Sequence, residues 1–436
     1  MDTTARQHPA RTNSPLAARH KSVPVNDPTQ NPPSSSNTTV SDEDSPMTGI
    51  EHAGKVMLGV VPDEGYVTES RQHRERSGSS FTPTDSLETV GARVKQLMDA
   101  MNEIARCGVP SVDISIPMTV VVGDQSVGKS SLIEGISGVK VPRDTGTCTR
   151  CVLQITTKES DQQDGAWSCI IYLRKHFDLY DAPLINPITG KPQPFGPWGP
   201  KDQPESTHFA SFSDPNDMER LLRAAQLATL TPSSVNPVAF AELPISRLEQ
   251  IEANVEFSPN VVSVEVTGPK LPNLSFYDLP GVISQTVNSE NNYLVKLVKA
   301  VVKSYVQNPH ALILLACSME NDLENSTAAS LVRKAGAEDR CIGVLTKPDR
   351  LAAGASIEMW HEVFSGRRFA LRHGYYVTRQ PSQAELKMNM SHQGAKNVEH
   401  SFFLEEPWVN HFAQYQERFG SWSLQAALSV KLAEQI

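Results

Sequence analysis

The 436-residue chain is long enough for about two or three domains, is 39% hydrophobic and carries a formal net charge of -9. This acidic balance disfavours a broad nucleic-acid-binding surface, so we expect no nucleic-acid partner. No run approaches the roughly 18 apolar residues of a membrane span, and the N-terminus has no apolar signal core. We therefore expect a cytoplasmic protein whose six cysteines are reduced thiols.

The N-terminal part of the chain divides into two segments. Residues 1–85 are rich in Ser, Thr, Pro and Asn and contain few aromatic residues. Such a segment cannot bury enough apolar surface to offset its chain entropy, and it is predicted to be disordered. Residues 86–112 are predicted to contain an amphipathic helix, because apolar residues recur at helical spacing from Val90 to Ala105.

From about residue 114, predicted strands alternate with helices, which is typical of an α/β fold with a mostly parallel sheet. Between about 160 and 258 this pattern loosens. The Pro- and Gly-rich stretch 183–204 is predicted to be an insertion loop without regular structure, and a helix is predicted at Asp217–Leu230. The predicted strands are Met118–Val122, Val261–Val266, Leu274–Tyr277, Ala311–Ala316, Cys341–Leu345 and Tyr375–Thr378.

The stretch GDQSVGKS, from Gly123 to Ser130, carries the strongest functional signal. It has the complete spacing G-x-x-x-x-G-K-S and stands between a predicted strand and a predicted helix, as a phosphate-binding P-loop does. Gly123 and Gly128 permit a tight turn, and the loop's N–H groups then face an anion. Lys129 is predicted to reach the β- and γ-phosphates, and the Ser130 hydroxyl to ligate Mg²⁺.

Two further motifs each follow a predicted strand. In the first, Asp278 can hold Mg²⁺ through water, while the N–H of Gly281 can meet the γ-phosphate. In the second, Thr346-Lys-Pro-Asp349, the Asp349 carboxylate can accept two donors that guanine has and adenine lacks. The stem of Lys347 can lie over the base. This second motif favours GTP over ATP and disfavours an ATPase or kinase.

A threonine-rich segment, TGTCTR at 145–150, follows the predicted P-loop helix. A threonine hydroxyl from such a loop can complete the Mg²⁺ shell only when the γ-phosphate is present, which would make the loop a switch. Spacing alone does not choose among Thr145, Thr147 and Thr149. Further along, the stretch 378–380 follows the last predicted strand and could line the base pocket.

Together these residues resemble the dynamin superfamily of large GTPases, with the fungal dynamin and Mx-like group nearest. The motifs that carry the resemblance are GDQSVGKSS at 123–131, VPRDTGTCTR at 141–150, VEVTGP at 264–269 with DLPG at 278–281, and LRHGY at 371–375. The resemblance covers about residues 86–436. It implies a P-loop GTPase fold in a dynamin-type extended GTPase domain at 113–420, with the start of a second bundle helix at 421–436.

The resemblance also implies catalytic residues. Gln125 would position the attacking water, Ser126 and a carbonyl of Gly146 would hold a monovalent cation, K⁺ or Na⁺, and Gly281 would contact the water. Thr149 would be the switch threonine. The Mg²⁺ ligands would be Ser130, Thr149 and, through water, Asp278. Motifs and resemblance together predict nucleotide contacts at Gly123, Asp124, Gln125, Ser126, Val127, Gly128, Lys129, Ser130, Ser131, Arg143, Gly146, Asp278, Gly281, Thr346, Lys347, Asp349, Arg350, Thr378, Arg379 and Gln380.

The chain departs from the family's pattern in several places. Asp144 stands where the family usually has glycine near the cation, and Val152 replaces a proline. The chain ends at Ile436, where family members continue into a helical stalk. A leucine stripe including Leu424 and Leu428 is expected to pair with the helix at 86–112 in the family's three-helix bundle.

The expected function is that of a dynamin-type GTP hydrolase in membrane remodelling, vesicle traffic or organelle dynamics. Its expected partners are GTP and GDP, a second copy through the GTPase domain, and an organelle membrane reached peripherally through a stalk or partner protein. The resemblance also allows microtubule binding. The alternative is a GTP-binding interaction module with low turnover.

Overall fold

The computed structural model describes only part of the chain. Expectations for the segments 1–85 and 86–112, and for residues 143–148 with Arg143 and Gly146, fall outside the described residues. The chain divides into two units, Met1–Arg76 and Ser77–Ile436, and every described residue belongs to the second. The described residues are 118–142, 149–160, 166–180, 193–269, 271, 274–285, 292–351, 356–388 and 390–435.

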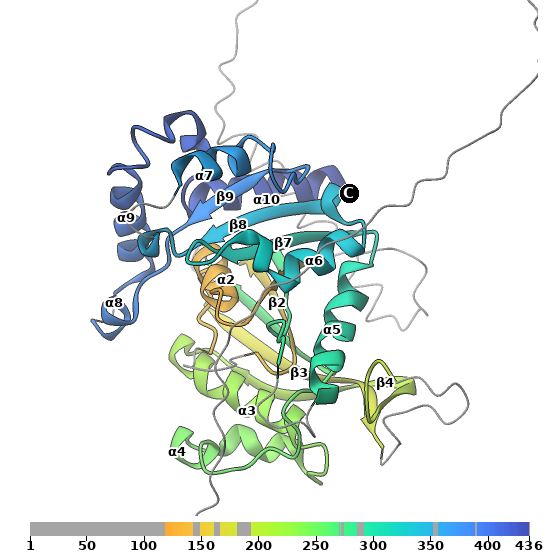
Figure 1. The fold of residues 1–436 in the computed structure, drawn as a ribbon. Coiled ribbons are helices and arrows are strands. Elements are labelled where there is room, and N and C mark those ends of the chain that lie inside the picture. The colour runs from red at the N-terminus through yellow and green to blue at the C-terminus, as the bar shows by residue number, and fades with distance from the viewer. Residues whose placement is uncertain are drawn as a thin grey trace, which may run out of the picture. The chain divides into compact units, whose positions relative to one another are not determined.

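A nine-stranded sheet lies at the centre of this unit, in the order β4-β3-β5-β2-β6-β1-β7-β8-β9 (Figure 1). One half is wholly parallel and consists of β6 (Leu274–Asp278), β1 (Met118–Gly123), β7 (Ala311–Ser318), β8 (Cys341–Thr346) and β9 (Tyr375–Thr378). The other half mixes directions and consists of β2 (Val152–Glu159), β5 (Val261–Gly268), β3 (Ser168–Leu179) and β4 (Trp198–Phe212). The mostly parallel α/β prediction and its six strands are confirmed.

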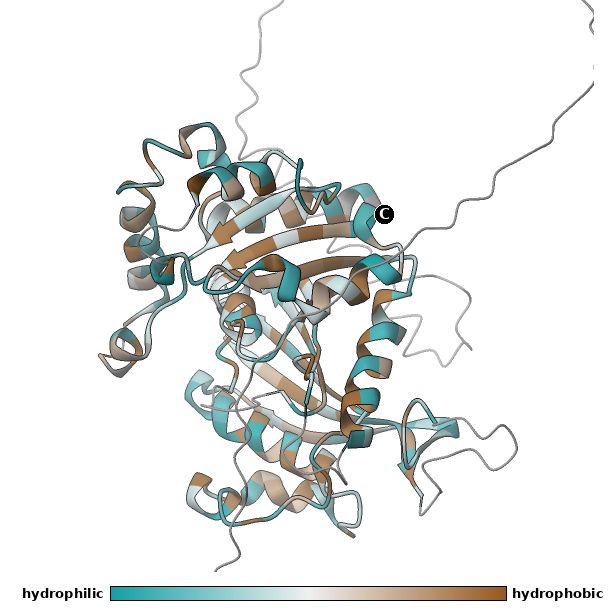
Figure 2. Ribbon diagram, in the orientation of Figure 1, coloured by the Kyte–Doolittle hydropathy of each residue, from teal (hydrophilic) through white to brown (hydrophobic). Residues whose placement is uncertain are grey.

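Helices cover both faces of the sheet. Strand β1 shows why, because Val120 and Val122 enter one core while Val121 between them enters the other, all three fully buried. The central strands are largely apolar, whereas the helices also carry polar residues (Figure 2). The first core includes α5 (Asn292–Val306), α6 (Thr327–Lys334) and α7 (Ile357–Phe364); the second includes α2 (Lys129–Ser137), α3 (Met218–Leu230), α4 (Ile245–Leu248) and α10 (Ser421–Gln435).

The expectation that residues 183–204 have no regular structure is wrong for 198–204. These residues form the first half of β4, where Trp198 to Pro200 pair with β3 in antiparallel register. An edge strand tolerates prolines because one of its sides makes no ladder hydrogen bonds. The buried Trp198 side chain joins the core and holds this end of the strand against the sheet. Residues 183–192 of the predicted insertion lie outside the described ranges.

The leucine stripe of α10 packs into the domain. Leu424, Leu428 and Leu432 are buried in the same core as the apolar residues of α2, and α10 contacts both α2 and β9. The three-helix bundle remains a prediction, because its expected partner at 86–112 is outside the described part. In the described part, no helix has the length and apolar character needed to cross a membrane.

Candidate nucleotide-binding site

The predicted motifs meet at one edge of the sheet. Strands β1, β6, β8 and β9 all lie in its parallel half. They end at Gly123, Asp278, Thr346 and Thr378 respectively. Ligands of open α/β sheets bind beyond the carboxyl ends of the parallel strands. The topology therefore places the P-loop, the DLPG motif and the TKPD motif side by side.

The loop between β1 and α2 has the backbone of an anion cradle. Gly128 precedes α2 in a left-handed conformation with φ 94°, and Ser126 is also left-handed with φ 63°. A Cβ on Gly123 would lie 2.7 Å from the Ala316 carbonyl oxygen, so only glycine fits there. These conformations turn the chain so that α2 begins at Lys129 with its N-terminal N–H groups at the loop. The predicted contact Ser131 lies in the first turn of α2.

Lys129 and Asp124, the two charged residues of the P-loop, make different contacts. Lys129 is only 7% exposed, and its Nζ donates to the Asp124 carbonyl oxygen at 3.2 Å. The Asp124 carboxylate accepts hydrogen bonds from Ser326 Oγ at 2.7 Å and from Ala328 N at 3.1 Å. That carboxylate therefore caps α6 and ties the P-loop to it. In this structure Asp124 presents its carbonyl, not its carboxylate, to Lys129.

The three predicted Mg²⁺ ligands converge behind the P-loop. Asp278 Oδ2 accepts from Thr149 Oγ1 at 2.9 Å and from Ser130 Oγ at 3.0 Å, and the two hydroxyls lie 3.3 Å apart. Neighbouring oxygen ligands of an octahedral Mg²⁺ with bonds of about 2.0–2.1 Å are separated by about 2.9 Å. Three oxygens from three separate segments thus gather at one point, with the two hydroxyls that would ligate Mg²⁺ beside the Asp278 carboxylate.

Asp278 itself has the electrostatics of a cation ligand. Its Oδ1 is buried and has no hydrogen-bond partner in the described part of the chain. Burial raises the pKa of the Asp278 carboxyl above its usual range, against the opposing effects of Lys129, Thr149 and Ser130. A bound divalent cation would offset the cost of ionising this buried carboxyl group. A water on that cation would supply the hydrogen-bond donor that Oδ1 lacks. The residues present therefore fit Mg²⁺.

The DLPG segment contacts the P-loop directly. Gln125 N donates to the Val282 carbonyl oxygen at 3.2 Å, and Val282 N donates to the Gly123 carbonyl oxygen at 3.1 Å. A Cβ on Gly281 would lie 2.9 Å from Gln125 Cα and 3.0 Å from Lys129 Nζ. Glycine is required at 281 because any side chain would collide with the P-loop.

The TKPD motif is fixed to the same loop by Thr346. This buried threonine donates through Oγ1 to the Val127 carbonyl oxygen at 2.6 Å, and Oγ1 also lies 3.2 Å from the Cys317 carbonyl oxygen. The next residue, Lys347, is left-handed with φ 55°. The Asp349 side chain is exposed. The predicted base-reading carboxylate is thus open to solvent on a loop held to the P-loop.

The stretch 378–380 points mainly into the protein. The Thr378 side chain is fully buried, and Arg379 binds the Glu385 carboxylate through Nη2 at 2.8 and 3.0 Å. Arg379 N donates to Glu399 Oε1 at 2.8 Å. The Gln380 amide lies against the backbone of Gly135 in α2. Gln380 is therefore the member of the three that lies next to the P-loop helix.

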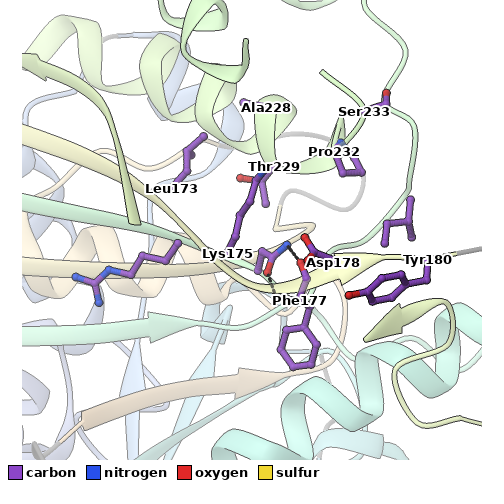
Figure 3. Close-up of a pocket in the computed structure, with 12 residues that line it drawn as sticks. Leu173, Lys175, Phe177, Asp178, Tyr180, Ala228, Thr229, Pro232 and Ser233 are labelled. Atoms are coloured by element: carbon purple, nitrogen blue, oxygen red, sulfur yellow. Dashed lines mark hydrogen bonds between the residues drawn. The ribbon is translucent and has the colours of Figure 1, made fainter. Parts of the chain in front are cut away.

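Two cavities adjoin the mixed and parallel parts of the sheet. One of about 350 Å³ is bordered by Gln125, by the segment 282–285, by the last two residues of β7 and by residues 321–323 and 325–327. It opens directly beside the P-loop. The other, of about 400 Å³, lies between β3 and α3 and is lined by residues such as Phe177 and Thr229 (Figure 3). None of the predicted nucleotide contacts borders this second cavity.

Among the described residues, one acidic side chain near the site was not predicted from the sequence. Glu320, just beyond the end of β7, binds both Lys347 and Arg350 of the TKPD segment. No motif marks it, and its only sequence signal is an acidic residue two positions after a buried strand.

Comparisons with known proteins agree with this arrangement. The family model described as "Dynamin family" matches residues 119–186 and 230–348. The matched residues are similar to the dynamin family. The dynamin-type match thus includes the P-loop, the DLPG motif and the first three residues of the TKPD motif, and the resemblance predicted from the motifs is confirmed.

Relatives with similar sequences are interferon-induced GTP-binding proteins. The chain is 28% identical over 317 residues to Mx2 of Canis lupus familiaris, which covers 72% of this chain and 37% of that protein. It is 26% identical over 317 residues to Mx2 of Homo sapiens, covering 72% and 36%. It is 25% identical over 326 residues to Mx1 of Ictalurus punctatus, covering 74% and 43%. The chain spans less than half the length of the curated relatives it matches.

Proposed function

We propose that this chain binds GTP with Mg²⁺ and hydrolyses it to GDP and phosphate. The observation that carries the proposal is the convergence of Ser130, Thr149 and Asp278 on one point beside the P-loop. Lys129 lies beside Ser130 at the N-terminus of α2 and would neutralise charge on the β- and γ-phosphates. The GTP-binding relatives and the exposed Asp349 carboxylate support guanine as the base.

The side chains divide the work of hydrolysis between them. Ser130 and Thr149 would hold Mg²⁺ directly, and the unpartnered Oδ1 of Asp278 would accept a hydrogen bond from a metal-bound water. When bound, Mg²⁺ would neutralise charge that develops on the phosphate oxygens. The exposed side chain of Gln125 borders the cavity beside the P-loop, where it would orient the attacking water. Ser126, next to it, would help to hold K⁺ or Na⁺.

Binding and turnover by the purified protein test this proposal. We expect GTP and GDP to displace a fluorescent guanine nucleotide while ATP does not, and EDTA to stop phosphate release. Replacing K⁺ by a large organic cation should slow phosphate release if Ser126 contributes to a cation site. Failure of the purified protein to bind GTP would contradict the proposal. Tight binding without turnover would instead favour the alternative, a GTP-binding interaction module.

Substitution of Thr149 by alanine should separate binding from chemistry. We expect Thr149→Ala to leave GTP affinity within about threefold and to lower kcat by at least roughly tenfold, since the switch threonine acts mainly in the transition state. Single-turnover phosphate release at saturating GTP measures the effect. Thr145→Ala and Thr147→Ala are the controls and should do less. An equal loss in either control would show that the wrong threonine has been assigned.

Assembly and cellular role extend the same proposal. We propose that the GTPase domain forms a homodimer when it binds a transition-state mimic such as GDP with aluminium fluoride, and that hydrolysis serves organelle or vesicle dynamics. The dynamin-type match supports both statements at the level of the family. Light scattering with and without the mimic tests the dimer, and an unchanged mass would count against it. Co-sedimentation with anionic liposomes tests membrane contact.

A further inference from the structure

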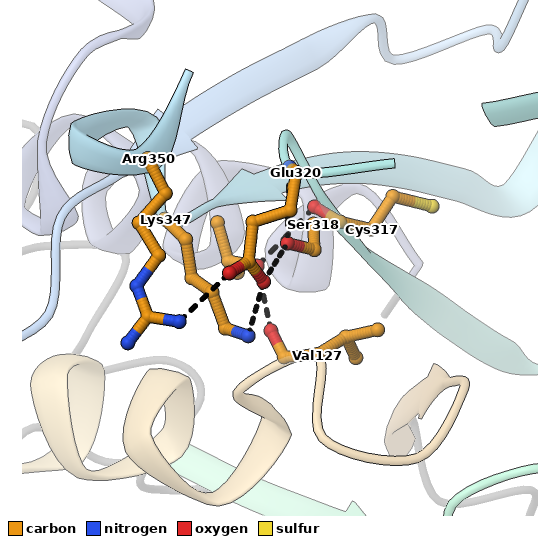
Figure 4. Close-up of polar contacts among 7 residues, drawn as sticks. Val127, Cys317, Ser318, Glu320, Lys347 and Arg350 are labelled. Atoms are coloured by element: carbon orange, nitrogen blue, oxygen red, sulfur yellow. Dashed lines mark hydrogen bonds and ion pairs between the residues drawn. The ribbon is translucent and has the colours of Figure 1, made fainter. Parts of the chain in front are cut away.

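Glu320 forms the most connected side-chain cluster near the base-reading loop. Its Oε2 accepts from Lys347 Nζ at 2.5 Å and from Ser318 Oγ at 3.0 Å, and its Oε1 accepts from Arg350 Nη1 at 2.7 Å (Figure 4). Ser318 also receives the Glu320 backbone N–H at 3.2 Å, which fixes the turn that follows β7. A single carboxylate therefore links the end of β7 to both basic residues of the TKPD segment.

The two basic residues stand on either side of Asp349. Without another anion nearby, a lysine and an arginine flanking a carboxylate are its natural ion-pair partners. In the described part of the chain, Asp349 makes no ion pair, because Lys347 and Arg350 are both bound to Glu320. Glu320, and more weakly Asp349, raise the pKa of Arg350, so the guanidinium lies in the field of both acids. The Glu320 carboxylate thus takes the cations that would otherwise compete with a guanine base.

The backbone of this loop also needs an external support. Lys347 is a non-glycine residue in the left-handed region, where side chains are strained. Thr346 fixes the loop before this residue through its hydrogen bond to the Val127 carbonyl oxygen. Glu320 fixes it at Lys347 and again at Arg350. The base-reading segment is therefore held on both sides of Asp349 by contacts within the protein.

The Glu320 cluster is stronger than an ordinary surface ion pair. The Glu320 side chain is 28% exposed and receives three side-chain hydrogen bonds, two of them from cations. Partial burial raises its pKa, but the hydrogen bonds from Lys347, Arg350 and Ser318 outweigh that effect and lower the pKa to about 2. The carboxylate consequently stays ionised at any pH at which the protein would be assayed.

We propose that Glu320 is a positioning residue for guanine recognition, which holds Lys347 and Arg350 so that the Asp349 carboxylate stays open to the base. This inference rests on the proposed function, GTP binding at the P-loop. Among the described residues, the Glu320 carboxylate bonds to Ser318, Lys347 and Arg350 and to none of the predicted Mg²⁺ ligands. It acts on the base-reading loop alone, so its loss should affect guanine recognition and leave the chemical step intact.

Glu320→Gln is the test, because it keeps the shape of the side chain and removes its charge. We expect GTP and GDP affinity to fall by about five- to tenfold, with a matching rise in KM and an unchanged kcat at saturating GTP. The affinity for inosine triphosphate, which lacks the exocyclic amine that Asp349 would bind, should fall less than the affinity for GTP. Glu320→Asp, which retains the charge, should restore part of the affinity.

Glu324→Gln is the matched control. Glu324 lies four residues further along the same segment and pairs with Arg368, away from the TKPD loop. The Glu324→Gln substitution should leave the affinities for GTP, GDP and inosine triphosphate unchanged. Unaltered GTP affinity in Glu320→Gln, or a fall in kcat equal to any rise in KM, would overturn the inference. Thermal melting without nucleotide verifies that each variant is folded. If the unmodified protein does not bind GTP, the proposed function fails first, which distinguishes the two failures.

Discussion

Lys129→Ala should reduce GTP affinity by at least about 30-fold. The ammonium group is nearly buried at the N-terminus of α2 and has the Asp124 carbonyl as a neighbour. Removing one member of a buried, hydrogen-bonded charge pair costs about 2–5 kcal/mol of binding free energy. In Lys129→Ala the bound phosphate oxygens would lack their cationic partner, so GTP binding should lose free energy in this range. Titration with a fluorescent GTP analogue measures the affinity.

Lys140→Ala is the matched control for this substitution. Lys140 is an exposed lysine shortly after α2, and its removal should leave GTP affinity unchanged. Both variants should be folded, which thermal melting without nucleotide can verify. If folded Lys129→Ala binds GTP as tightly as Lys140→Ala does, the lysine does not contact phosphate and the P-loop assignment is wrong.

The parallel half of the fold was predictable from the sequence. Its strands β1, β7 and β8 are short, mostly apolar runs, and β1 and β8 are each followed by a motif with its own chemistry. Near-continuous apolar runs of this length are typical of parallel strands that are buried on both faces. Because the carboxyl ends of parallel strands share an edge, the order of the motifs also predicted that Lys129, Asp278 and Asp349 belong to one site.

The mixed half was harder to predict. Strand β3 alternates buried and half-buried residues along its first half, and β4 is mostly exposed. The apolar run of β3 ends at Leu173 and is followed by charged residues, and β4 has no apolar run. The two are stabilised by pairing with each other and with β5, which is a tertiary effect and leaves little local signal. Proline at 200 and 204 then favoured a loop, although an edge strand accommodates both.

The supporting contacts of the site were also beyond sequence reasoning. Asp124 was expected at the nucleotide, yet its carboxylate caps α6, more than 200 residues away in the chain. Glu399 accepts from Arg379 N and from Ser421 N, and so joins the end of β9 to the start of α10. Each contact joins a motif to a residue with no motif of its own. Only the three-dimensional arrangement reveals such pairs.

Asp349→Asn should convert a guanine site into a xanthine site. The Asp349 carboxylate is expected to accept the N1–H and exocyclic amine of guanine, and hydrogen bonds to a charged group contribute about 1.5–3 kcal/mol each. An asparagine amide offers one acceptor and one donor, so the donor would face the guanine amine without a partner. We therefore expect GTP affinity to fall by roughly 100-fold.

Xanthosine triphosphate should show the opposite change. Its C2 carbonyl can accept a hydrogen bond from the new amide NH₂, while its N1–H donates to the amide oxygen. The substitution should cost little stability, because the side chain is exposed and surface changes usually alter the free energy of unfolding by less than about 0.5 kcal/mol. Competition of GTP and xanthosine triphosphate against one fluorescent nucleotide measures both affinities in the same sample.

Asp339→Asn provides the matched control, since Asp339 is an exposed aspartate in the turn before β8, at the opposite end of the same strand. It should leave the preference for GTP over xanthosine triphosphate unchanged. In the Asp349→Asn background, Lys129→Ala should still weaken nucleotide binding, now measured with xanthosine triphosphate, because phosphate binding does not depend on the base. If Asp349→Asn retains the original preference, the exposed carboxylate at the end of β8 does not read the base, and guanine must be recognised from the loop after β9.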